Sequence, residues 1–152
     1  MKSSDSLSYC HKQVGKYQII FVLLILVILF IAALLSTSEK NAVIILTFCC
    51  CIMICILLIF VTLTVSIDSE HLMLAFGPVP LIRKKYSLSE IESVSHFTYP
   101  WYYGYGIRLT PNGLLYNISG SDAIKIKFYS GKVINIGTDE PDMLLFALEK
   151  AG

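Results

Sequence analysis

Four cysteines within seven residues, Cys49, Cys50, Cys51 and Cys55, are the residues whose type and spacing come nearest to a metal site. On a helix, adjacent side chains point about 100° apart, so three neighbouring thiols cannot converge on one ion. Only Cys51 and Cys55 share a helix face, and two ligands do not complete a tetrahedral site. We therefore predict that no metal is bound, and that these cysteines serve as small apolar residues of a packed or lipid-facing helix.

Catalytic machinery is not evident among the remaining reactive residues. Cys10 and His11 are neighbours, but one such pair supplies too few ligands for a metal, and acylation of a cysteine near a membrane span is a weak signal. The segment Gly104-Tyr105-Gly106 lacks the third glycine and the following helix of a dinucleotide-binding motif. We predict a protein that is not an enzyme, with no cofactor and no small-molecule substrate.

The densest positive cluster is Arg83-Lys84-Lys85. Each basic residue near an anionic leaflet contributes about 1 kcal/mol, so the three could orient a domain on lipid headgroups or on a phosphorylated partner. The alternative is a solvated face of a strand. The whole chain carries a net charge of only +1, so we expect no nucleic-acid partner.

An aromatic segment follows, with Tyr99, Trp101, Tyr102, Tyr103 and Tyr105 around Pro100 and Gly104. Trp and Tyr concentrate at membrane and protein interfaces because each joins a large apolar body to a polar tip. The segment could form a membrane-resting loop or a protein-docking surface. The alternative is that Tyr102 and Tyr105 pack inside a barrel, while the glycines relieve a tight bend.

The elements that carry these residues begin with two apolar runs. The 152-residue chain is 55% hydrophobic and 15% charged, with 17 consecutive apolar residues at 19–35 and 24 residues at 42–65 interrupted only by three threonines. As helices these runs would be roughly 26 and 36 Å long, against a hydrocarbon core of about 30 Å. We predict an N-terminal segment at 1–17 and a two-helix transmembrane hairpin at 18–65. A cleaved signal peptide is the competing interpretation of the first run, but that run is longer than usual and lacks a small-residue cleavage site.

Basic residues predict how the hairpin is oriented. Lys2, Lys12 and Lys16 precede the first span, Lys40 stands in the six-residue connection at 36–41, and a basic group at 83–85 follows the second span. Positive residues favour the cytoplasmic side, so both termini should be cytoplasmic and the protein should lie in the plasma (inner) membrane.

Residues 66–152 have a different pattern. Apolar side chains alternate at 72–76 and at 124–128, which indicates half-buried strands, and Ser130-Gly131 indicates a hairpin turn. The period changes after Pro141, where an apolar stripe predicts one C-terminal helix. We predict a small all-β barrel or half-open sheet of about seven antiparallel strands, whose end or edge this helix covers.

Several elements of this region resemble bacterial membrane proteins that join two transmembrane helices to a pleckstrin-homology-like (PH-like) domain. The resemblance covers most of residues 62–150 and is carried by Leu63-Thr-Val-Ser-Ile-Asp68, Phe76-Gly77, Arg83-Lys84-Lys85, Leu88–Val94, Trp101–Arg108, Tyr116–Gly120 and Ile136–Pro141. It implies a seven-stranded PH-like barrel with a C-terminal helix, and it implies little about activity. Phosphoinositide binding is not implied, because Ser66, Asp68, Ser69 and Glu70 stand where that pocket would need basic residues.

Together these features predict an integral membrane protein with a cytoplasmic interaction module. Its partners would be the lipid bilayer and either another protein or further copies of this chain. The alternative is a small subunit of a transport or channel assembly. Neither span holds an ionisable residue, which a pore or a proton path normally needs, and this argues against the alternative.

Overall fold

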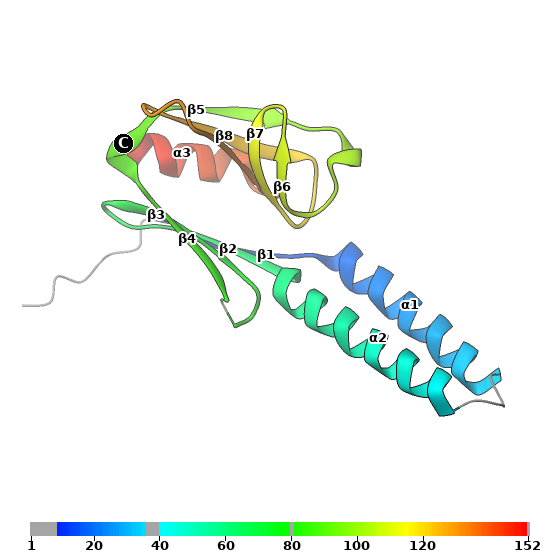
Figure 1. Cartoon of the computed structure of the whole chain (residues 1–152). Helices are drawn as coiled ribbons and strands as arrows, with labels where there is room; N and C mark the ends of the chain where they lie inside the picture. Colours follow the sequence, from blue (N-terminus) through cyan, green and yellow to red (C-terminus); the bar gives the residue numbers. More distant parts are fainter. Residues whose placement is uncertain (1–8, 36–39, 80, 152) are drawn as a thin grey trace, which may run out of the picture.

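A computed structural model describes residues 9–35, 40–79 and 81–151, without the side chains of residues 40–42 and 101. These residues form a β-rich head and two long helices that project from one end of it (Figure 1). In chain order the elements are β1 (Tyr9–Val14), α1 (Lys16–Leu35), α2 (Lys40–Phe60), β2 (Thr62–Ile67), β3 (His71–Phe76), β4 (Ile82–Ser87), η1 (Leu88–Glu90), β5 (Ile91–Thr98), η2 (Trp101–Tyr103), β6 (Gly106–Thr110), β7 (Gly113–Asn117), β8 (Asp122–Phe128), β9 (Val133–Gly137) and α3 (Pro141–Ala151).

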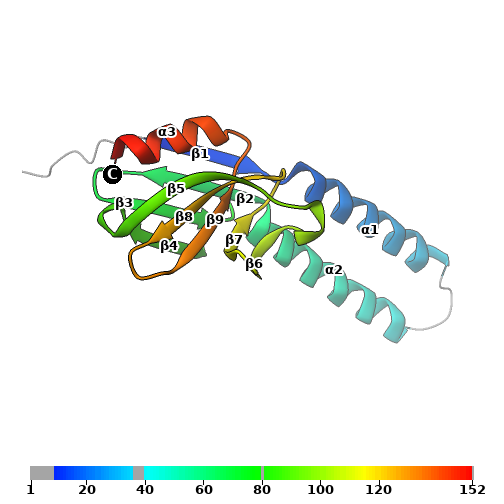
Figure 2. The ribbon, with the colours of Figure 1, turned by 90° about the horizontal axis from the view of Figure 1, so that it is seen from above.

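The two apolar helices are confirmed, and they lie side by side away from the head (Figures 1 and 2). Among their described side chains only Val22 is buried, and Phe30 and Phe48 are 64% and 65% exposed. Helices of 20 and 21 residues are roughly 30 Å long, close to the thickness of the hydrocarbon core. An apolar surface of this size is consistent with a helical hairpin embedded in a membrane.

The second helix is shorter than the predicted span 42–65. It ends at Phe60, and residues 62–67 form strand β2, so the last part of the apolar run belongs to the head. The reason is a change of period: Leu63, Val65 and Ile67 are at most 1% exposed, whereas the threonine and serine between them point to the other face. Branched side chains such as Thr and Val also favour a strand over a helix.

The N-terminal segment predicted at 1–17 is not separate from the β domain. Its residues Tyr9–Val14 form β1, an edge strand that pairs antiparallel with β2 from Tyr9↔Ile67 to Val14↔Thr62. The helices are thus an insertion between two neighbouring strands, and the domain predicted at 66–152 also includes β1 and β2.

The head is built from two sheets, and the described residues form no closed barrel. One is an antiparallel sheet in the order β1-β2-β3-β4, and the other has the order β5-β8-β9-β7-β6, in which β7 and β9 are parallel. No strand pairing joins the two sheets in the described part of the chain. The 3-10 helix η1 turns the chain between β4 and β5, so that β5 pairs with β8 instead of extending the first sheet.

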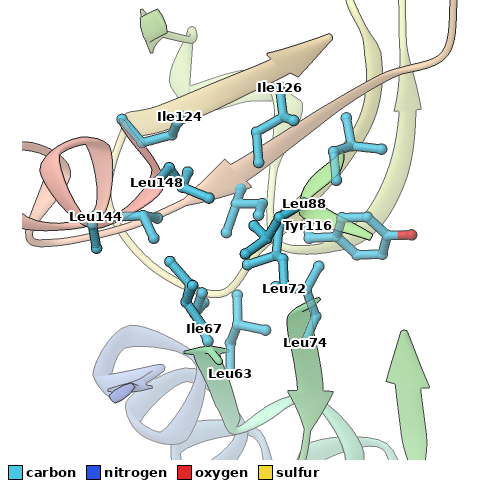
Figure 3. Close-up of a cluster of buried hydrophobic side chains, with 14 of the residues drawn as sticks. Leu63, Ile67, Leu72, Leu74, Leu88, Tyr116, Ile124, Ile126, Leu144 and Leu148 are labelled. Carbon is cyan, nitrogen blue, oxygen red and sulfur yellow. The ribbon is translucent and has the colours of Figure 1, made fainter. Parts of the chain in front are cut away.

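The core lies between the two sheets and under α3 (Figure 3). Strand β2 contributes Leu63 and Ile67, β8 contributes Ile124 and Ile126, and α3 contributes Leu144. The C-terminal helix and its start at Pro141 are therefore confirmed. Burial of these side chains is what holds the two sheets and the helix together.

Candidate functional site

The connection between the head and the helices determines which surface of the head lies next to the helices. Only Gly15 separates β1 from α1, and only Val61 separates α2 from β2. The Gly15 N–H donates a hydrogen bond to the Val61 carbonyl at 2.8 Å, so the two connections are tied to each other. We call this pair the neck. A neck of two single residues fixes the orientation of the head relative to the helices.

The aromatic segment is divided by the structure into a packed half and an exposed half. Tyr99 is 3% exposed, lies in a small apolar cluster with Leu115 and Ala123, and donates its hydroxyl to the Gly120 carbonyl at 3.0 Å. The Tyr103 ring stacks parallel to that of Tyr99, with centroids 6.4 Å apart. Burial raises the pKa of Tyr99 above its ordinary value. These two tyrosines stabilise the fold of the segment. A substitution at Tyr103 would therefore disturb the packing of the head as well as any surface that binds a partner.

Tyr102 and Tyr105 form the exposed half, at 67% and 39% exposure. The alternative in which these two rings pack inside the head does not agree with their exposure, and Tyr99 and Tyr103 pack there instead. The Trp101 side chain lies outside the described part of the structure, although its backbone begins η2. The spacing of aromatic residues along an irregular segment does not show which rings are buried. Here that depends on contacts with Leu115 of β7 and Ala123 of β8.

The basic triplet lies on β4, and its three side chains are exposed. The strand register divides them, because Lys84 is opposite Leu74 on the core side, whereas Arg83 and Lys85 are opposite Ala75 and Met73 on the outer face. The register therefore places Lys84 on one face of β4 and the other two basic residues on the opposite face.

The outer face of the first sheet carries a different basic set. Two rows cross its four strands, and each row contains at least one basic residue and no acidic one. They are Lys12-Thr64-Ala75-Arg83 and Cys10-Ser66-Met73-Lys85. Sequence reasoning could not have placed Lys12 with Arg83, because 71 positions separate them and the pairing depends on β1.

The connection between β3 and β4 lies against the end of α2. A Cβ added to Gly77 would lie 2.9 Å from the Leu58 carbonyl oxygen, and Gly77 has a φ of +86°, which an L side chain rarely adopts. Val79 and Leu81 follow it and are 67% and 69% exposed. We call Gly77, Pro78, Val79 and Leu81 the β3–β4 tip. It places exposed apolar side chains next to the end of the apolar helix α2.

An open groove of about 640 Å³ lies between the head and the helices. Its apolar walls are Phe21 and Val22 of α1, Met53, Ile56, Leu57 and Phe60 of α2, and Ile107 of β6, and its polar lining comes from Gln18, Tyr105 and Arg108 together with Gly104 and Gly106. The volume falls within the 300–1,000 Å³ that is typical of ligand sites.

Arg108 is the cation of this groove, and its side chain is held in place. Its Nε donates to the Tyr105 carbonyl at 3.0 Å, and its guanidinium carbon lies 3.3 Å from where a Cβ of Gly104 would be. Gly104 and Gly106 have φ of +69° and +104°, so the bend under Arg108 requires glycine. No carboxylate forms an ion pair with Arg108 among the residues that the structure describes.

Neither the groove nor Arg108 was identified as a site from the sequence. The available signal was the Gly-x-Gly-Ile-Arg element at 104–108, which entered only through the resemblance. The groove forms because β1 and β2 lead directly into the helices and so place them beside β6. No local sequence pattern predicts this arrangement.

The His11 ring connects the edge strand to the start of α3. Its Nε2 lies 2.7 Å from an Asp139 carboxylate oxygen, and its Nδ1 lies 3.2 Å from Glu140. Beside it, the pKa of Tyr9 is raised to about 12, by burial first and then by the same two carboxylates. The two contacts of His11 anchor β1 to the start of α3.

Comparison with known proteins gives no family, since no family model, no curated protein and no solved structure matches this chain. The two exposed apolar helices, the two-sheet head and the groove between them are thus the features from which function is argued.

Proposed function

We propose that this chain is a two-span integral membrane protein whose head is a PH-like binding module, held on the cytoplasmic surface of the plasma membrane. In this proposal both termini are cytoplasmic, and the protein binds lipid headgroups or a partner at the membrane without catalysing a reaction. Two sheets with a C-terminal helix packed on their core support the PH-like interpretation. The parallel β7–β9 pair and the added strand β1 depart from the barrel that the resemblance implies.

The neck is the observation that carries the proposal. A head on a long linker would sample many orientations, whereas this one is fixed to both helices by single residues and a hydrogen bond. The same surface is then always directed at the bilayer. Binding there avoids much of the entropy that a freely rotating partner would lose.

The surfaces near the neck have the character that a bilayer boundary requires. The β3–β4 tip and the aromatic segment both lie at the end of the head from which the helices leave (Figures 1 and 2). The tip adds exposed Val79 and Leu81, and Arg83 follows within two residues. Apolar side chains flanked by cations are typical of segments that rest in the headgroup region.

The basic residues also support the cytoplasmic placement. Lys12, Lys16, Arg83 and Arg108 lie on elements at or beside the neck. An excess of Lys and Arg close to the spans favours the cytoplasmic side.

Fluorescence quenching by brominated phospholipid in vesicles tests whether the head rests on the bilayer. The full-length protein would carry Val79→Trp in a Trp101→Phe background, with Tyr129→Trp in the same background as the control. Tyr129 is 72% exposed in the β8–β9 connection, at the far end of the head (Figure 1). We expect strong quenching at position 79 and none at position 129. Equal, weak quenching at the two positions would contradict the proposal.

A further inference from the structure

We propose that the groove between α1, α2 and β6 binds one anionic phospholipid, with its phosphate at Arg108 and an acyl chain along the two helices. This inference rests on the proposed membrane placement and adds to it a defined ligand site. It differs from a general attraction of the head to the bilayer because it concerns one lipid in one groove.

The walls of the groove match an acyl chain. The part contributed by α2 runs from Met53 to Phe60, its last two turns, which corresponds to about 10 Å along the helix axis. The facing part of α1 is its first two turns, with Phe21 and Val22. The groove thus begins at the head and continues along helix surface that lies in the hydrocarbon region of the membrane.

Polar groups gather at the head end of the same groove. The Arg108 guanidinium is exposed, held by Tyr105 and without a carboxylate partner among the described residues. Gln18 also lines this end of the groove, but its amide oxygen is a buried acceptor that lies against Gly15, so it does not bind the phosphate. Tyr105 adds an amphipathic ring at the level where Tyr is enriched in membrane proteins.

This distribution favours a phospholipid over other occupants. A guanidinium binds phosphate oxygens through charge-assisted hydrogen bonds, and no acidic residue lines the groove to compete with an anion. A soluble phosphate would use the cation and leave the apolar walls uncovered. An apolar helix of another protein would cover the walls and make no use of the arginine.

Native mass spectrometry of the full-length protein in detergent micelles tests the site, with phosphatidylglycerol, phosphatidylcholine or glycerol 3-phosphate added. Two pairs of variants separate charge from shape. Arg108→Gln removes the cation, and Lys125→Gln removes one positive charge outside the groove. Leu57→Trp fills the groove, whereas its neighbour Leu58→Trp changes an exposed, lipid-facing position.

We expect one phosphatidylglycerol retained per chain, with apparent affinity reduced at least about tenfold by Arg108→Gln and by Leu57→Trp. The two control variants should retain the lipid as the unmodified protein does. Glycerol 3-phosphate should neither bind nor displace it.

Other results would overturn the inference. If phosphatidylcholine were retained as well as phosphatidylglycerol, and Arg108→Gln had no effect, the groove would make only the non-specific lipid contacts of any membrane helix. Binding of glycerol 3-phosphate that is insensitive to Leu57→Trp would indicate a soluble-anion site. Lipid-free dimers lost in Leu57→Trp would assign the groove to a second copy of this chain.

The two proposals fail in different ways. Loss of specific lipid retention with position 79 still quenched would leave the membrane-held head intact. Retention of the lipid without quenching at position 79 would overturn the placement of the head on the bilayer and leave the lipid site.

Discussion

Asp68 shows how one side chain gives a turn of the head its shape. Its Oδ1 accepts hydrogen bonds from the backbone N–H of Glu70 at 2.8 Å and of His71 at 2.6 Å, which closes the connection between β2 and β3. These hydrogen bonds to the ionised form are the main reason that the pKa of Asp68 lies below its ordinary value of 3.8, and the nearby His71 and Lys85 lower it further. The carboxylate thus has a structural role in this turn.

We predict that Asp68→Ala lowers the free energy of unfolding of the head by about 1 kcal/mol at pH 7, because two backbone donors lose their acceptor. A lowered pKa in the folded state means that this stabilisation is present above the unfolded-state pKa and is lost as the pH falls through and below it. The difference between Asp68→Ala and the unmodified protein should therefore shrink between about pH 5 and pH 3. Thermal unfolding of the full chain in micelles, followed by circular dichroism, measures both quantities.

The control for this prediction is Glu149→Gln, which removes a negative charge from the exposed side of α3. It should change the stability little at either pH. A deficit of Asp68→Ala that stays the same from pH 7 to pH 3 would mean that the ionised carboxylate is not what the turn requires.

At the scale of elements, strand β1 connects the helices to the rest of the head. It covers the open edge of β2 and is held there by Gln13, whose buried Nε2 donates to the Gly137 carbonyl of β9 at 2.9 Å. His11 adds its contacts to Asp139 and Glu140. Because β1 also leads directly into α1, these contacts are part of what holds the helices to the head.

We predict that Gln13→Leu destabilises the head by about 1–2 kcal/mol, since the Gly137 carbonyl would stay buried without its donor. The neighbouring substitution Lys12→Leu, on the exposed face of the same strand, is the matched control and should have a much smaller effect. Hydrogen exchange of the β2 amides should accelerate in Gln13→Leu alone. Equal effects of the two substitutions would show that strand composition, and not the hydrogen bond to β9, determines the stability of β1.

Local patterns were sufficient for some elements and insufficient for others. Alternation identified the strands at 72–76 and 124–128, and the change of period at Pro141 identified α3, because each signal lies within the element itself. Strand β1 has no such signal: its inward residues are Tyr9, His11 and Gln13, and its partner β2 lies about 50 residues away. The division into two sheets could not be predicted for a related reason. The change of sheet at η1 and the parallel β7–β9 pair both depend on distant strands and are not encoded in any single strand.

At the scale of the whole molecule, the helices and the head form one unit joined at the neck. The sequence predicted both parts correctly in outline but placed the boundary at residue 65, so the head would have followed the hairpin as a separate domain. The observed insertion between β1 and β2 brings Gln18, Phe60 and Arg108 to one groove, although each lies on a different element. Sites of this kind are formed by topology, which is why the candidate residues at 83–85 and 99–105 were visible in the sequence and the groove was not.

The orientation of this unit in the membrane can be tested with its own cysteines. Cys10 is exposed on the outer face of β1, whereas Cys49, Cys50, Cys51 and Cys55 lie on α2 within the proposed span. A charged reagent does not reach a thiol that lies in lipid, so Cys10 is the site at which we expect a membrane-impermeant maleimide to react. If the head is cytoplasmic, intact cells should show no labelling and permeabilised cells should show labelling that Cys10→Ser abolishes. Labelling of Cys10 in intact cells would place the head outside, and the basic residues around the neck would then need an explanation other than the cytoplasmic preference of positive charge.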